Sequence, residues 1–121
     1  MPEQLRLTII AVSLIVVSGT FDAIGFTYAA RIWQENHLQW KALVHSAVGF
    51  ATGIAIYWFT IRYFWELGVV SPELQTLIWF GTTLVGVAIL SGRFLQWHSS
   101  DQFVAVLVLA GIAWLLVRVE N

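Results

Sequence analysis

Cysteine is absent from this chain of 121 residues, so the sequence excludes disulfides and thiolate metal sites. Charge is also scarce, because only 11% of the residues are charged, against about 25% in ordinary soluble domains. The six basic residues form no cluster, and without one there is no electrostatic footprint for nucleic acid. Hydrophobic residues make up 59% of the chain. Such a balance cannot cover a surface that faces water, and it predicts a membrane protein.

Four uncharged or nearly uncharged runs remain when the sequence is divided at its charges. They are Leu7–Ala30, Ala42–Ile61, Leu74–Gly92 and Gln102–Val117, of 24, 20, 19 and 16 residues. A helix needs about 20 apolar residues to cross a bilayer, and the stem of Arg118 can extend the short last run. We therefore predict an all-α membrane protein with four transmembrane helices in an up-down bundle and no strand. The single domain covers residues 1–121, with helices near 7–32, 40–64, 73–95 and 101–118.

The first run has an alternative interpretation as a cleaved signal peptide, because it begins near Arg6. The apolar core of a signal peptide is typically about 7–15 residues long. This run is longer and contains an acidic residue, Asp22, which would be unusual in such a core. A membrane helix is therefore the favoured interpretation.

The segments between the runs are short and polar. Ser71-Pro72-Glu73 has the pattern of a helix start, with Ser71 as the cap and Pro72 at the first helical position. Tryptophan is favoured where a span reaches the headgroups. The residues at or just beyond the span ends are Trp33, Trp40, Trp65 and Trp97.

Basic residues are divided equally between the two sides of the predicted bundle. Arg6, Arg62 and Arg118 lie on the side of the N-terminus, and Arg31, Lys41 and Arg93 lie on the other. Orientation in a membrane follows the excess of Lys and Arg on the cytoplasmic side. A count of three against three gives no preference. It predicts insertion in both orientations, unless a translocon or a partner selects one.

Asp22 is the single charged residue of the first run. Its stacked neighbours on a helix are mostly small: Ser18, Gly19, Gly25, Phe26 and, one turn further on, Ala29. Such a face lets another helix approach closely, so we expect Asp22 to face protein or a water-filled cavity. Desolvation disfavours the charged form of a carboxyl group, and a proton and an organic cation can each neutralise it. We interpret Asp22 as a shared proton and substrate site.

A structural role for Asp22 is the alternative. The carboxylate would then form hydrogen bonds within the protein, paired with Arg31, Lys41 or a serine. Arg31 lies nine residues further on, about 13–14 Å along a helix axis. That is too far for a direct pair within one helix.

Aromatic side chains near the acid would add cation–π attraction for a guanidinium or quaternary ammonium group. The candidates are Phe26, Tyr28, Trp58 and Trp79, and the predicted pocket lining is Ser18, Phe26, Trp58 and Trp79. Trp79 also fits an interface anchor. Because Tyr57-Trp58-Phe59 runs around the helix, some of these three rings must face lipid.

Two further features have a structural and a functional interpretation. Gly49 and Gly53 form a small-xxx-small pair, for which helix packing is the more ordinary role. His45, near the start of the second run, can be a proton carrier or an axial ligand for a chlorin or haem. More often such a histidine is simply hydrogen-bonded or solvated.

Three stretches resemble the small multidrug resistance transporters. Gly19-Thr-Phe-Asp22-Ala-Ile24-Gly25, followed by Arg31, is similar to that family's first helix, where a glutamate is followed by a lysine. Ile78-Trp79-Phe-Gly81, then Gly86, Ile89, Ser91 and Phe94, is similar to its third helix, and Leu109-Ala110-Gly111-Ile112 to its fourth. The resemblance implies an antiparallel homodimer of dual topology that exports cationic compounds in exchange for protons. It also implies a dimer contact at Ala110, Gly111 and Ala113.

The chain departs from this family at several positions. Its membrane acid is Asp22 rather than glutamate, Thr76 stands where the family has a tyrosine, and Val104 stands where it has a glycine of the fourth helix. The departures fall mainly on pocket residues. The fold implied by the resemblance is therefore better supported than the drug export.

Two functions of different classes follow. The first is a proton-coupled antiporter for small organic cations in a bacterial inner membrane, active as an antiparallel homodimer or heterodimer. The second is a non-transporting membrane subunit or heterodimer partner on the same scaffold. Half of a lipid-carrier flippase is a third, weaker interpretation. We expect no enzymatic activity, no cofactor and no metal.

Overall fold

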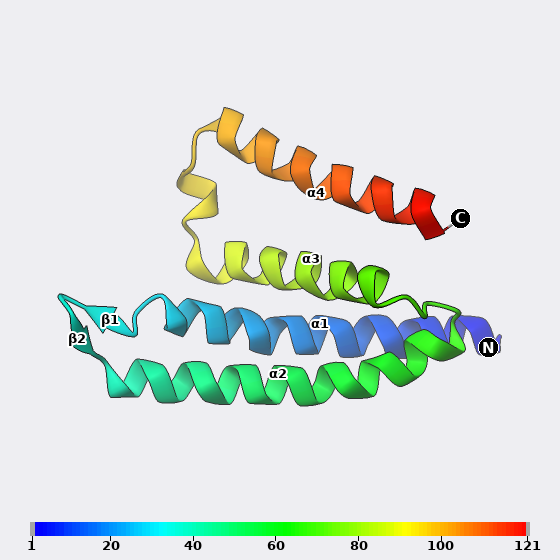
Figure 1. Ribbon diagram of the computed structural model, residues 1–121, viewed down its shortest axis with the longest axis horizontal. Coiled ribbons are helices and arrows are strands. Elements are labelled where there is room, and N and C mark those ends of the chain that lie inside the picture. The colour runs from blue at the N-terminus through cyan, green and yellow to red at the C-terminus, as the bar shows by residue number, and fades with distance from the viewer. Residues whose placement is uncertain (1, 121) are drawn as a thin grey trace.

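The computed structural model describes residues 2–120, which form four helices (Figure 1). The helices are α1 (Glu3–Ala29), α2 (Trp40–Glu66), α3 (Pro72–Ser91) and α4 (Ser99–Glu120). A hairpin of β1 (Trp33–Gln34) and β2 (His37–Leu38) joins α1 to α2, and a short 3-10 helix, η1 (Phe94–Gln96), precedes α4. The predicted all-α fold with four helices is confirmed.

The expectation of no strand was wrong. Trp33 pairs with Leu38 and Gln34 with His37 in an antiparallel ladder. Glu35 and Asn36 between them have φ values of 52° and 65°, and a two-residue hairpin turn of type I′ needs positive φ at both central positions. Asparagine is enriched at positive φ, whereas glutamate is not and so does not indicate a turn of this type. The hairpin is therefore difficult to find in the sequence.

Three helices are long and apolar enough to cross a membrane, judged by their length and composition. They are α1, α2 and α3, of 27, 27 and 20 residues. The apolar part of α4, Ser99–Leu115, is shorter. The four tryptophans expected near the span ends are all exposed: Trp33, Trp40, Trp65 and Trp97.

The start of α3 confirms the predicted cap. The backbone N–H of Leu74 donates to Oγ of Ser71 at 3.1 Å, and Pro72 occupies the first helical turn. The end of α3 comes earlier than residue 95, where we predicted it. Gly92 has a left-handed backbone with φ 68°, which glycine adopts without the steric cost of a Cβ and which commonly ends a helix.

Helix α1 occupies the centre of the molecule. Figure 1 shows α2 and α3 along opposite sides of α1, with α4 beyond α3. The most extensive contacts in the chain are those of α1 with α2 and with α3, whereas the main helical contact of α4 is with α3. The buried apolar side chains of α1 are Leu7, Ala11, Ile15 and Ala23. Residue 22 lies on the buried face of this helix, about two-thirds of the way along it.

Candidate functional site

Glycines bring the backbones of α1 and α2 together around Asp22. A Cβ added at Gly49 would lie 2.9 Å from the backbone nitrogen of Gly25 and 3.0 Å from the carbonyl oxygen of Phe21. A Cβ added at Gly53 would overlap the carboxylate of Asp22. The two glycines therefore form a close-packing face, as the sequence predicted. This packing also presses the acid against a neighbouring backbone.

Two serine hydroxyls tie the same two helices together. Ser18 of α1 donates from Oγ to the carbonyl oxygen of Gly53 at 2.8 Å. Ser46 of α2 donates from Oγ to the carbonyl oxygen of Gly25, also at 2.8 Å. Both serines are buried. The α1–α2 interface thus has two matched hydrogen bonds, and only the first lies beside the acid.

Small residues bring α3 equally close to the other flank of α1. A Cβ at Gly19 would lie 2.7 Å from the methyl group of Thr82, and one at Gly86 would lie 2.9 Å from the Cβ of Ala23. This approach places Trp79 next to Asp22. Its indole Nε1–H donates to Oδ2 of Asp22 at 2.5 Å. Acid and indole come from α1 and α3, 57 positions apart in the sequence.

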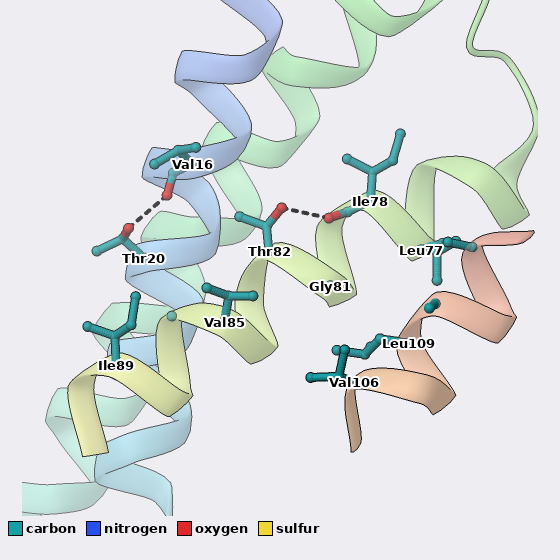
Figure 2. Close-up of a pocket in the computed structure, with 13 residues that line it drawn as sticks. Val16, Thr20, Leu77, Ile78, Gly81, Thr82, Val85, Ile89, Val106 and Leu109 are labelled. Carbon is teal, nitrogen blue, oxygen red and sulfur yellow. Dashed lines mark hydrogen bonds between the residues drawn. The ribbon is translucent and has the colours of Figure 1, made fainter. Parts of the chain in front are cut away.

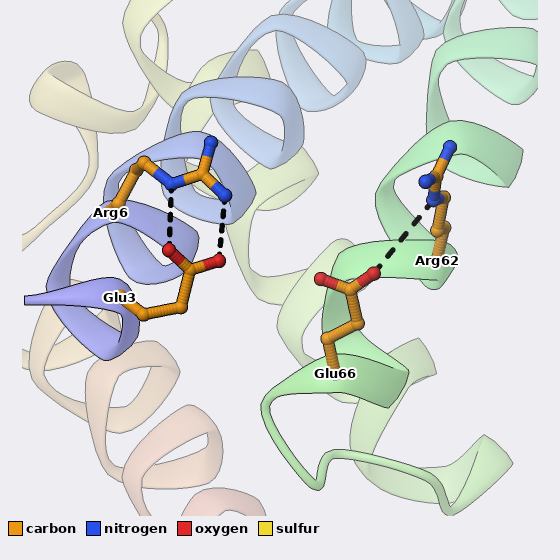
Figure 3. A network of polar contacts seen from close by, with 4 residues as sticks. All are labelled: Glu3, Arg6, Arg62 and Glu66. Carbon is orange, nitrogen blue, oxygen red and sulfur yellow. Dashed lines mark hydrogen bonds and ion pairs between the residues drawn. The ribbon is translucent and has the colours of Figure 1, made fainter.

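Asp22 is fully buried, with 0% of its surface exposed. Its Oδ1 atom has no hydrogen-bond partner among the described residues. The ion pairs found in the described part of the chain are distant from it: Glu3 with Arg6 at 2.6 Å, and Arg62 with Glu66 at 3.9 Å (Figure 3). These four residues belong to the start of α1 and the end of α2. A carboxylate in this position therefore has no cationic partner from residues 2–120.

The structure unites only part of the predicted pocket. Ser18 and Trp79 lie beside Asp22. Phe26 packs edge to face on Phe50 at 4.8 Å, and 42% of its surface is exposed. Trp58 points away from the core of the chain, with 67% of its surface exposed. The last two therefore do not surround the acid in this chain.

Tyr57 is the aromatic residue that the sequence interpretation missed. Its ring lies 6.1 Å from that of Trp79. Both rings pack against the apolar cluster of Ala11, Ile15 and Phe64. The signal was present, because Tyr57 lies four residues after Gly53 and so shares its helix face. The neighbouring Trp58 was predicted to line the pocket instead.

Tyr28 and His45 form a separate cluster nearer the hairpin. Their rings stack at 4.8 Å, and the guanidinium group of Arg31 lies 5.6 Å from the centre of the Tyr28 ring. Nδ1 of His45 lies 2.6 Å from the carbonyl oxygen of Lys41. His45 is exposed, which fits the simple hydrogen-bonded role.

An apolar groove of about 820 Å³ lies between α3 and α4 and reaches one flank of α1 (Figure 2). Thr20 and Thr82 line it, but their hydroxyls donate to Val16 and Ile78 on their own helices. Asp22 is not among its lining residues. The other lining residues include Val85, Val106, Leu109, Ala110 and Ala113.

The predicted dimer contact is divided by this geometry. Ala110 and Ala113 face the groove within the chain. Gly111 has open space where a side chain would stand, with no heavy atom within 4 Å of its ideal Cβ position. Gly111 therefore does not line the groove with the other two residues.

The Trp79 bond gives a direct stability test. Trp79→Phe removes the indole donor and leaves the buried carboxyl group without its hydrogen bond. Leaving a buried acceptor unsatisfied costs about 1–3 kcal/mol, and we expect a loss of that size in the free energy of unfolding. Trp58→Phe, the same change on an exposed ring, should stay within about 0.5 kcal/mol of wild type. Unfolding in mixed detergent micelles, followed by circular dichroism, measures both, and equal losses would contradict the role given to Trp79.

No group of three or more metal-ligating side chains is present among the described residues. No family model, curated protein or solved structure matches the chain. The arrangement of Asp22, Trp79, Ser18 and Gly53 must therefore be interpreted on its own chemistry.

Proposed function

We propose that the chain is a proton-coupled antiporter that exports small organic cations as an antiparallel dimer. One observation carries the proposal. Asp22 is fully buried between three apolar helices, with one oxygen bonded to Trp79 and the other without a partner in the described part of the chain. Burying a charge without a partner is costly, so this carboxylate needs a proton or a cation. Ionisable residues inside membranes commonly belong to substrate pathways and proton relays.

Competition for one charge supplies the coupling. When Asp22 holds a proton it is neutral and has no attraction for a cation, and when a cation binds it the proton must leave. Tyr57 and Trp79 lie close enough to add aromatic faces to such a site. In this conformation the backbone of Gly53 packs against the Asp22 carboxylate and leaves no room for a cation there. Access therefore requires α1 to separate from α2 or α3 at this level, first on one side of the membrane and then on the other.

The antiparallel dimer is supported by two properties of the chain. The basic residues are divided three against three between the two ends of the bundle, which favours insertion in both orientations. Helix α4 also carries exposed apolar side chains, including Phe103, Leu107 and Trp114. A homodimer through α4 would leave α1, α2 and α3 of each protomer to form the site.

A non-transporting membrane subunit is the second candidate, and the Trp79 bond favours it. The indole ties α3 to the acid of α1, and the serine bonds tie α1 to α2. On this interpretation Asp22 is part of the same packing system. The groove of Figure 2, which Asp22 does not line, is then a surface for other membrane helices.

Proton release on addition of a cation separates the two functions. We expect purified protein in weakly buffered detergent to release protons when tetraethylammonium or guanidinium is added. Because one proton competes with one cation, affinity should fall about tenfold per pH unit on the acidic side of the titration, measured between about pH 5 and 9. Affinity that does not change with pH, or the absence of binding and proton release, would favour the subunit.

A further inference from the structure

Ser18 lies one helical turn before Asp22, on the same helix face, where its hydroxyl is near two different acceptors. It donates to the carbonyl oxygen of Gly53 at 2.8 Å, and the Asp22 carboxylate lies beside it against the same glycine. Gly53 itself is in contact with Oδ1 of Asp22. That oxygen has no partner among the described residues. One hydroxyl therefore stands between the acid of α1 and a backbone carbonyl of α2.

The hydroxyl can satisfy only one of these acceptors at a time. A serine has one proton to donate and two lone pairs that accept. While it donates to Gly53, it can still accept a hydrogen bond from the neutral carboxylic acid. An ionised carboxylate can only accept. It therefore competes with the Gly53 carbonyl for the single proton of Ser18.

The competition favours the carboxylate once Asp22 loses its proton. A hydrogen bond to an ionised acceptor is about twice as strong as one between neutral groups. When Ser18 donates to the carboxylate, the buried carbonyl oxygen of Gly53 loses its hydrogen bond from α1. Ser46 makes the matched bond to Gly25 and forms no hydrogen bond to Asp22 in the described part of the chain.

The other groups around Asp22 do not replace Ser18 in this role. From α2, the packed residue is Gly53, and the titratable group on the same helix face is Tyr57, whose ring lies 6.1 Å from that of Trp79. From α3, the indole of Trp79 already donates to Oδ2. Thr83, also on α3, forms no hydrogen bond to Asp22, because its buried hydroxyl has no partner in the described part of the chain. No basic side chain of the described residues pairs with the acid.

We propose that Ser18 exchanges its hydrogen-bond partner with the protonation state of Asp22, bonding Gly53 when the acid is neutral and the carboxylate when it is ionised. Loss of the proton thereby releases the α1–α2 bond at the level of the site. Ser18 acts as a positioning residue, and its role in transport rests on the proposed function. The exchange links the chemistry of one carboxyl group to the helix contact that must open to admit a cation.

The carbonyl carbon of Gly53 reports this exchange directly by NMR. Labelling glycine with ¹³C at the carbonyl and isoleucine with ¹⁵N selects only the Gly53–Ile54 and Gly111–Ile112 peptide bonds. Labelled aspartate adds only Asp22 and Asp101. We expect the Gly53 carbonyl signal to move with pH along the titration curve of Asp22. The signal of Gly111, which is remote from the acid, should remain unchanged.

Three variants make the result decisive. In Ser18→Ala and in Asp22→Asn, the pH-dependent movement of the Gly53 signal should be lost. In Ser46→Ala, which removes the matched α1–α2 bond, it should remain. A Gly53 signal that stays fixed while Asp22 titrates, or one that moves equally in Ser18→Ala, would overturn the exchange. So would an Asp22 signal that does not titrate.

Cation binding distinguishes this failure from failure of the transporter. Titration of the wild-type protein with tetraethylammonium tests the proposed function independently of the Gly53 signal. If the signal titrates but no cation binds, the exchange stands and transport is rejected. If cations bind with proton release while the signal is fixed, transport stands and the exchange is rejected.

Discussion

Asp22→Asn is expected to abolish proton release on cation addition and to remove cation binding, while the helices remain folded. The amide has nearly the size of the carboxyl group and still accepts from the indole of Trp79, so packing is retained. It cannot ionise. Truncating one partner of a buried charge pair costs about 2–5 kcal/mol, which is a loss of affinity of about thirtyfold or more. Isothermal titration with tetraethylammonium and a pH electrode measure the two effects.

The matched control is Asp101→Asn. Asp101 is the only other aspartate of the chain and is exposed in the first turn of α4. It should bind the cation and release protons like wild type. Asp22→Glu restores an ionisable group at the site and should therefore restore proton release. If Asp22→Asn binds the cation as tightly as wild type, the carboxylate is structural and the subunit interpretation holds.

Gly49→Ala should cause a clear loss of stability, because it overpacks the α1–α2 interface. The added Cβ would lie 2.9 Å from the Gly25 nitrogen and 3.1 Å from its Cα. These are backbone atoms of α1, so they cannot rotate away as a side chain would. Overpacking of this kind typically costs about 1–3 kcal/mol. Thermal unfolding in detergent should show the loss together with weaker α1–α2 contact.

Gly81→Ala controls for the change in helix propensity. Gly81 is also within a helix, but no heavy atom lies within 4 Å of its ideal Cβ position. Alanine is favoured over glycine inside a helix by about 1 kcal/mol, so this variant should be as stable as wild type or more so. A Gly49→Ala protein with the stability of the Gly81→Ala protein would show that α1 and α2 do not pack as described.

The fold was largely predictable because its main determinants are local. Hydrophobic run length sets the number of helices, and Ser71 with Pro72 marks the start of α3 through cap chemistry that does not depend on tertiary structure. The hairpin was missed because Glu35 takes a positive φ that its residue type disfavours. The left-handed Gly92 ends α3 before residue 95; this glycine is the last residue of its apolar run, and the prediction extended the helix beyond it.

The site was predictable in its centre and less so in its surroundings. Asp22 stood out because a charge in an apolar run is rare, and Ser18 follows from one helical turn. Trp79 reaches Asp22 because Gly19 and Gly86 let α3 pack close to α1. This contact joins segments that are distant in the sequence, and helix periodicity alone does not predict it. The partner of Ser18 is a backbone carbonyl, and every residue has one. No pattern of side chains identifies Gly53 as that acceptor.

Helix α4, through which we propose that the dimer forms, lies outside the three helices that surround Asp22. It follows the left-handed Gly92 and the η1 turn, and it packs mainly on α3 (Figure 1). A load applied to α4 would reach the acid mainly through α3, which approaches α1 closely at Gly19 and Gly86. Helix α4 can thus be anchored while α1 and α2 shift against each other. In the proposed dimer, sequence change on the outer face of α4 would alter the choice of neighbour without rebuilding the surroundings of Asp22.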